Sequence, residues 1–120
     1  MGRRAKKRKE EKFKRALAKI IDENTRDRKF DFATITDVEL SDDFKYADVY
    51  VDIIGDEDEK ESSLEKFNQE EGFFRTNLAH QLNPRFTPEL TFKLDRSLER
   101  LNRIEEILAK DKEKEDRESD

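Results

Sequence analysis

The segment YADVYVDI, residues 46–53, alternates strictly between apolar and polar side chains. A period of two predicts a β-strand with one buried face and one exposed face. The apolar set consists of Ala47, Val49, Val51 and Ile53. The opposite face carries Asp48 and Asp52, and acidic side chains make that face a poor platform for RNA.

The segment before it, residues 33–40, alternates in the same way but changes phase once. Ala33 and Ile35 form the first apolar pair, and Val38 and Leu40 form the second. A shift of one residue in a period of two predicts a β-bulge, here near Asp37. Residues 41–45 would then make the turn of an antiparallel hairpin.

A helical apolar stripe follows the hairpin over residues 58–82, with one break. The stripe consists of Leu64, Phe67, Phe74, Leu78 and Leu82. Glu71 stands where the next apolar residue is due, and Gly72 follows. An acid is expensive to bury and glycine weakens a helix by about 1 kcal/mol, so the pattern predicts two helices that meet at a bend. The acids at the bend would cap the start of the second helix.

Two further elements are predicted towards the C-terminus. Residues 88–94 alternate as a third strand, and a helix follows from about Ser97 to Leu108. The apolar stripe of that helix is Leu98, Leu101, Ile104 and Leu108. Residues 110–120 contain no apolar side chain, and we expect a disordered charged tail.

The N-terminal region combines an apolar stripe with a high density of positive charge. Phe13, Leu17, Ile20 and Ile21 predict an amphipathic helix over residues 11–24, preceded by a basic arm at 1–10. If the helix begins by residue 8, Arg8, Lys12, Arg15 and Lys19 continue the arm as a basic ridge. The elements together predict an α+β domain at 11–109, with a three-stranded sheet and the order α-β-β-α-(kink)-α-β-α.

Composition excludes several classes of protein and site. The chain has 120 residues, no cysteine and one histidine, His80, which removes disulfides, thiolate metal sites and histidine clusters. No apolar run is long enough to span a membrane, and no glycine-rich phosphate loop or nucleophile motif is present. We expect a cytoplasmic protein without enzymatic activity, metal or cofactor.

Charge is distributed unevenly along the chain. Residues 3–19 hold ten basic and two acidic side chains, whereas residues 56–71 hold eight acidic and two basic ones, in a chain of net charge −5. A basic arm on an acidic body favours a polyanionic partner, above all a nucleic acid. A solubilising arm and an acidic surface that docks on a basic protein remain the alternatives.

Five stretches resemble the ribosome-binding factor A family in that family's order. They are TITDVELS at 34–41, YADVYV at 46–51, GFFR at 72–75, PELTF at 88–92 and RIEEIL at 103–108. The resemblance implies a KH-like fold of the second type, in which a helix kink written Ala-x-Gly replaces the RNA-binding glycine loop. Here the kink reads Glu70-Glu71-Gly72, so the glycine matches and the alanine does not. Asp42 also departs from the basic residue that many members carry after the turn serine.

The resemblance implies a function in late maturation of the small ribosomal subunit, notably in the cold. Members bind 16S ribosomal RNA within the 30S subunit, and ribosomal proteins could add contacts. We expect a monomer with no membrane partner. Arg75, which follows the kink, matches a position where members present a basic residue to RNA. The candidate RNA-binding residues are Arg3, Arg4, Lys6, Lys7, Arg8, Lys9, Lys12, Arg15, Lys19, Arg26, Arg28, Arg75 and Arg85. Arg100 and Arg103 are further candidates, unless they only pair with Glu99, Glu105 or Glu106 on their own helix.

Overall fold

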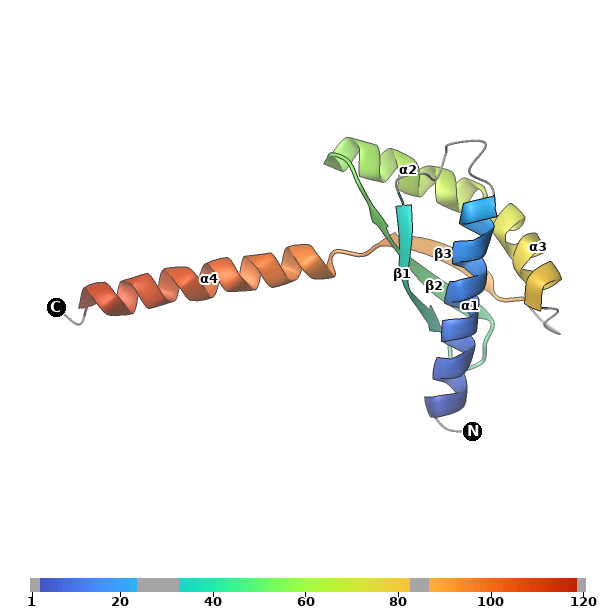
Figure 1. The fold of residues 1–120 in the computed structure, drawn as a ribbon, viewed down its shortest axis with the longest axis horizontal. Helices are drawn as coiled ribbons and strands as arrows, with labels where there is room; N and C mark the ends of the chain where they lie inside the picture. The colour runs from blue at the N-terminus through green and yellow to red at the C-terminus, as the bar shows by residue number, and fades with distance from the viewer. Residues whose placement is uncertain (1–2, 24–32, 83–86, 119–120) are drawn as a thin grey trace.

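The computed structural model describes residues 3–23, 33–82 and 87–118, the last six of these by backbone alone. The elements run α1 (Arg3–Glu23), β1 (Ala33–Leu40), β2 (Tyr46–Ile53), α2 (Glu57–Gln69), α3 (Glu71–Leu82), β3 (Glu89–Leu94) and α4 (Ser97–Glu118). This order confirms the predicted α+β class and is in keeping with the KH-like arrangement that the resemblance implies. Figure 1 shows α1, α2 and α3 gathered around the sheet, whereas α4 points away from it.

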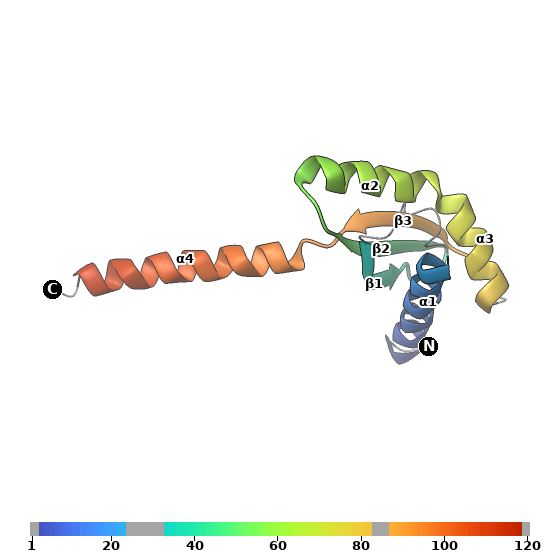
Figure 2. The same ribbon diagram turned by 45° about the horizontal axis from the view of Figure 1, so that its top comes forward.

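The sheet has the strand order β1-β2-β3 and is mixed (Figure 2). β1 and β2 pair as the predicted antiparallel hairpin, and β2 and β3 run parallel. A parallel pair needs a long crossover, and α2 and α3 provide it. The apolar side chains of the strands join those of α1, α2 and α3 in one buried cluster. The helices therefore cover one face of the sheet.

The predicted bulge in β1 is confirmed. The pairing with β2 shifts between Ile35 and Asp37, so Thr36 is the extra residue. The shift returns Val38 and Leu40 to the buried face, where both are at most 3% exposed. The Thr36 hydroxyl donates a hydrogen bond to Asp95 Oδ2 at 2.5 Å, which ties the bulge to the end of β3.

Three phenylalanines fix the bent helix pair on the sheet. Phe67 of α2, Phe74 of α3 and Phe92 of β3 are at most 1% exposed. Their ring centroids lie 5.0–5.7 Å apart, within the range of favourable aromatic contacts. The apolar stripes of α2 and α3 thus both pack on Phe92 of β3, although the two helices have different axes.

The first helix begins earlier than the sequence predicted. α1 starts at Arg3 and crosses the boundary placed between an arm at 1–10 and a domain from 11. Lysine, arginine, glutamate and alanine are all good helix formers, so the apolar stripe underestimates the length. Lys6 Nζ lies 3.0 Å from Asp42 Oδ1, and Glu10 Oε2 accepts a hydrogen bond from Leu40 N at 2.7 Å. These contacts hold the additional turns against the hairpin.

The last helix also differs from its prediction. α4 continues to Glu118 through residues 110–118, for which we expected disorder. Its sequence there consists of charged residues of both signs, which favour an exposed helix by propensity and side-chain pairing. Leu98, Leu101, Ile104 and Leu108 form the predicted stripe but are 51–69% exposed. Among the described residues, no helix is both long enough and apolar enough to cross a membrane.

Candidate nucleic-acid interface

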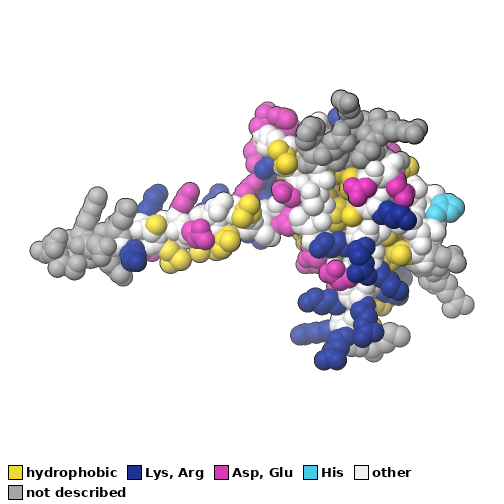
Figure 3. All heavy atoms as spheres, in the orientation of Figure 1, with side chains coloured by type: hydrophobic (Ala, Val, Ile, Leu, Met, Phe, Trp, Pro, Cys, Tyr) yellow, Lys and Arg dark blue, Asp and Glu magenta, His cyan; other side chains and the backbone are white. Residues whose placement is uncertain are grey.

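The densest group of cations lies on α1. Figure 3 shows Lys and Arg side chains gathered over this helix, near the N-terminus. The helix turns Phe13, Leu17 and Ile20 towards the sheet, where they are at most 6% exposed. With 3.6 residues per turn, Arg8, Lys12, Arg15 and Lys19 then face solvent together on the opposite side, and all are exposed. The predicted ridge is therefore present.

Most of these cations have no anionic partner among the residues that the structure describes. Lys19 Nζ lies 3.7 Å from Glu23 Oε1, Lys6 pairs with Asp42, and Lys9 Nζ lies 4.5 Å from the centroid of the Phe44 ring. Six further exposed cations of α1 form no ion pair within the parts of the chain that the structure describes. They are Arg3, Arg4, Lys7, Arg8, Lys12 and Arg15. Their charge is available to an external anion.

The bend between α2 and α3 lies at Glu70, as the broken stripe predicted. Glu70 has φ −93° and ψ 15°, and its carbonyl oxygen accepts a hydrogen bond from Phe74 N at 3.1 Å. Glu71 occupies the first turn of α3, where a carboxylate interacts favourably with the helix dipole. A Cβ built on Gly72 would meet no described atom within 4 Å beyond its chain neighbours and its own helix backbone. Gly72 therefore makes no close approach to another part of the described chain.

Side chains on both sides of the bend bond to the outer edge of β3. Asn68 Oδ1 accepts a hydrogen bond from Phe92 N at 2.8 Å, and Asn68 Nδ2 donates one to Phe92 O at 3.1 Å. Glu71 Oε1 accepts a hydrogen bond from Leu90 N at 3.0 Å. This explains how Glu71 interrupts the apolar stripe without leaving a buried charge unsatisfied. Asn68 was not predicted, because its partner lies 24 residues away along the chain.

Arg75 lies one turn beyond the bend and is partly engaged. Its Nη2 donates a hydrogen bond to Thr87 O at 3.3 Å, and its Nε lies 3.9 Å from Glu71 Oε1. The side chain remains 40% exposed. Arg75 thus connects α3 to the start of β3 and still presents part of its guanidinium to solvent.

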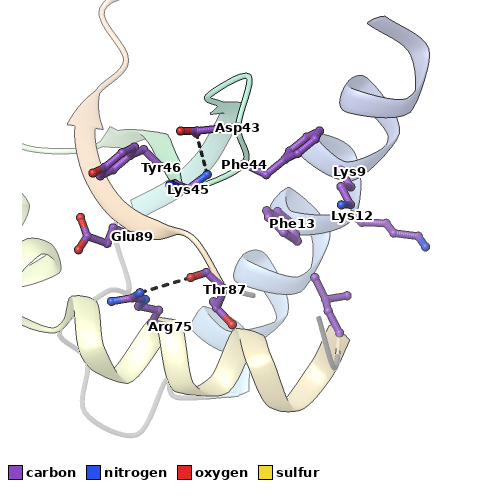
Figure 4. A pocket seen from close by; sticks show the side chains of 11 residues that line it. Lys9, Lys12, Phe13, Asp43, Phe44, Lys45, Tyr46, Arg75, Thr87 and Glu89 are labelled. Atoms are coloured by element: carbon purple, nitrogen blue, oxygen red, sulfur yellow. Dashed lines mark hydrogen bonds between the residues drawn. The ribbon is translucent and has the colours of Figure 1, made fainter. Parts of the chain in front are cut away.

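A cavity of about 740 Å³ lies beside the basic ridge (Figure 4). It opens between α1, the 41–45 turn, α3 and the start of β3. Lys9 and Lys12 of α1 border it on one side, and Arg75 of α3 borders it on another. The cavity therefore joins the cations of α1 to the cation next to the bend.

The other predicted contacts are dispersed. Arg26, Arg28 and Arg85 lie outside the described residues. Arg100 and Arg103 are exposed on α4, far along the chain from the ridge. No ion pair joins either of them to another described residue, and Glu99 pairs with Lys60 and Arg96.

The described residues place no cluster of metal-ligating side chains beside these cations. His80 is exposed on α3. No group of three or more histidine, cysteine, aspartate or glutamate side chains in the described chain could hold a metal ion.

Part of the acidic 56–71 region is used to hold the fold together. Asp56 caps α2, with Oδ1 accepting a hydrogen bond from Glu59 N at 2.8 Å. Arg96 donates to both carboxylate oxygens of Glu57, at 3.1 and 2.9 Å. The hydrogen bond from Arg96 is the main cause that lowers the pKa of Glu57 below the usual glutamate range. These acids are therefore less available to a basic protein than the sequence suggests.

Comparison with known proteins agrees with this architecture. Residues 5–108 match the family described as Ribosome-binding factor A. The Macrococcus caseolyticus ribosome-binding factor A is 35% identical over 99 residues, which cover 82% of this chain and 87% of that protein. The Heliobacterium modesticaldum protein of the same name is 40% identical over 99 residues, or 82% of each chain.

Solved structures give the same result. The crystal structure of ribosome-binding factor A from Thermus thermophilus superposes with a TM-score of 0.65 at 30% identity, covering 74% of this chain and 94% of that one. A homology model of the Thermus thermophilus factor, fitted into a cryo-electron microscopy map of a 30S complex with that factor, has a TM-score of 0.58 at 32% identity. It covers 70% of this chain and 88% of that one. By sequence and by fold, the chain belongs to the ribosome-binding factor A family.

Proposed function

We propose that this protein is a non-enzymatic maturation factor of the small ribosomal subunit, which binds 16S ribosomal RNA inside that subunit. It would act in the cytoplasm as a monomer, without a cofactor. The observation that carries the proposal is the exposed group of six cations on α1 that have no partner among the described residues. Membership of the family, and the 30S complex of its Thermus thermophilus member, support ribosomal RNA as the polyanion.

The chemistry of the ridge fits contacts with phosphates rather than with bases. Lysine and arginine side chains on an exposed helix neutralise backbone phosphates and release counterions, which gives affinity and orientation without reading sequence. Specificity would then come from the shape of the folded RNA and from contacts nearer the bend. We infer that α1 and the region around Arg75 form one surface, because the cavity borders both.

The test is the salt dependence of binding to purified small subunits. Lys12→Gln combined with Arg15→Gln removes two exposed cations of the ridge and leaves every buried side chain unchanged. We expect weaker binding, and a slope of log affinity against log salt that is smaller by roughly 0.7–0.9 for each lost phosphate contact. Lys110→Gln combined with Lys112→Gln is the matched control, since it removes two exposed cations from α4.

Two results would contradict the proposal. One is an unchanged slope for the ridge variant. The other is an equal change for the control, which would mean that only net charge matters. Binding to RNA-free ribosomal proteins with full affinity would instead support the acidic surface as the docking site.

A further inference from the structure

The cavity beside the ridge combines an apolar floor with a cationic rim. Phe13, Phe44 and Leu82 contribute apolar surface to the cavity, and Tyr46 adds an exposed aromatic ring. Lys9, Lys12, Lys45 and Arg75 supply four cations to the rim, beside the two carboxylates of Asp43 and Glu89. Its volume of about 740 Å³ lies within the range of small-molecule sites, which are mostly apolar with a few placed polar groups.

The turn holds Phe44 in an unusual conformation. Phe44 has φ 60°, in the left-handed region that residues other than glycine rarely adopt. The turn is fixed by hydrogen bonds from Phe44 N to Ser41 O at 3.0 Å and from Lys45 N to Asp43 Oδ1 at 3.1 Å. A bulky residue in this region is strained, and such strain persists only where the surrounding structure imposes it. Here it places an aromatic ring at the mouth of the cavity, next to α1 (Figure 4).

One side of that ring faces a cation rather than the core. Phe44 is half-buried against the core cluster, and Lys9 Nζ lies 4.5 Å from its ring centroid. An exposed cation–π contact of this kind contributes about 0.5–1 kcal/mol. Lys9 itself is exposed and has no ion pair with the described residues, so it can move away from the ring.

We propose that this cavity takes up one unstacked nucleobase of RNA, which stacks on Phe44 in place of the Lys9 side chain. The proposal rests on the proposed function and adds to it a contact with a base. A nucleobase has two apolar faces and a polar edge, which match the apolar floor and the polar groups of Thr87 and Glu89 at the side of the cavity. The displaced Lys9, with Lys12, is then free to neutralise the adjacent phosphates.

The same geometry selects single-stranded or looped RNA. Bases in a duplex are stacked and paired, so their faces are not accessible to a protein ring. Stacking on an aromatic side chain is worth more than an exposed cation–π contact, and it tolerates any base. A cavity of this kind would therefore hold a splayed base of folded ribosomal RNA.

The first experiment follows the Phe44 ring by aromatic NMR in the full-length protein. A short single-stranded oligoadenylate is titrated in, and a paired RNA stem of similar charge serves as the comparison. We expect the ring signals of Phe44 to move with the oligoadenylate, while those of Tyr50, on the far face of the sheet, do not. Absence of a shift at Phe44, or an equal shift with the paired stem, would overturn the proposal.

The second experiment measures affinity for the same oligoadenylate. Phe44→Leu keeps an apolar side chain against the core but removes the aromatic face. It should weaken binding at least about fivefold and leave the salt slope unchanged, because no charge is lost. Tyr50→Leu, the matched control outside the cavity, should bind normally. Full affinity of Phe44→Leu would contradict the stacking contact.

A separate measurement distinguishes this proposal from the proposed function. The wild-type protein is tested for binding to whole small subunits. Suppose that the wild-type protein binds subunits, and that Phe44→Leu matches the wild type in binding both subunits and the oligoadenylate. In that case only the base contact fails. If the wild-type protein does not bind subunits, the proposed function fails, whatever the oligoadenylate shows.

Discussion

Gly72 contributes less to the bend at Glu70 than do Asn68 and Glu71, which flank that bend. The space around its α-carbon is open, and its φ is not in the left-handed region. Asn68 and Glu71 instead bind the backbone of β3 and thereby set where α2 stops and α3 starts. The bend therefore depends on hydrogen bonds made by neighbours rather than on the absence of a side chain.

Gly72→Ala should therefore stabilise the protein. A methyl group would meet no described atom within 4 Å beyond the local helix backbone, and alanine is favoured over glycine inside a helix by up to about 1 kcal/mol. The midpoint of urea denaturation should rise, with an unchanged slope. A lower midpoint would show that the glycine is required by the bend.

The residues that bind β3 show where sequence reasoning stops. The broken stripe located the bend correctly, because an acid at an apolar position is a local signal. Asn68 gave no such signal, since its partner, Phe92, lies 24 residues away and depends on the final packing. Phe44 was missed for the same reason, because its left-handed turn and its contact with Lys9 follow from tertiary structure.

The outer edge of β3 is sealed by side chains instead of by a further strand. An exposed strand edge presents unpaired N–H and C=O groups that invite pairing with another chain. Asn68 bonds both groups of Phe92, and Glu71 bonds the N–H of Leu90. α2 and α3, which connect β2 to β3, thus also protect the free edge of β3.

Asn68→Ala should destabilise the protein by about 1–3 kcal/mol, because two backbone groups of Phe92 lose their partners in a half-buried place. Asn77→Ala is the control, since Asn77 Nδ2 donates its hydrogen bond to the Phe73 carbonyl of its own helix and, among the described residues, not to a strand. Chemical denaturation of both variants tests this. A loss of the same size in both would mean that the β3 edge has no special role.

The lengths of α1 and α4 show what apolar periodicity in the sequence cannot predict. The stripe placed the core segments of α1 and α2 correctly, because burial there is what selects the residues. It could not detect the basic first turns of α1 or the charged end of α4, where no described side chain is buried. There helix formation follows from residue propensity, which leaves no apolar pattern in the sequence.

In the whole molecule, a group of ion pairs joins α4 to the body. Arg96 pairs with Glu57 and Glu99 at 2.9 Å, and Lys60 pairs with Glu99 at 3.1 Å. Hydrogen bonds from Arg96, and then from Lys60, lower the pKa of Glu99, as Arg96 does for Glu57. Every described side chain of α4 itself is exposed. The direction of α4 therefore depends on charges near its first turn.

Acid should weaken this junction. Because the pKa of each carboxyl is lower in the folded chain than in the unfolded chain, the pairs add stability at neutral pH and lose it as the pH falls below about 4. In Arg96→Gln, the carboxyl NMR titrations of Glu57 and Glu99 should move to higher pH. Arg103→Gln, which removes an arginine outside the group, should leave both titrations in place. Unchanged titrations in Arg96→Gln would contradict this account.

The projecting α4 also changes how large one copy of the protein looks in solution. Its 22 residues extend the molecule to 66 × 39 × 18 Å, with a radius of gyration of 18.6 Å. A compact chain of this length would have a radius of gyration of about 14 Å. A single copy therefore diffuses like a compact protein of greater mass. Size-exclusion chromatography calibrated with globular standards would overestimate its molecular mass, and so the number of copies in the particle.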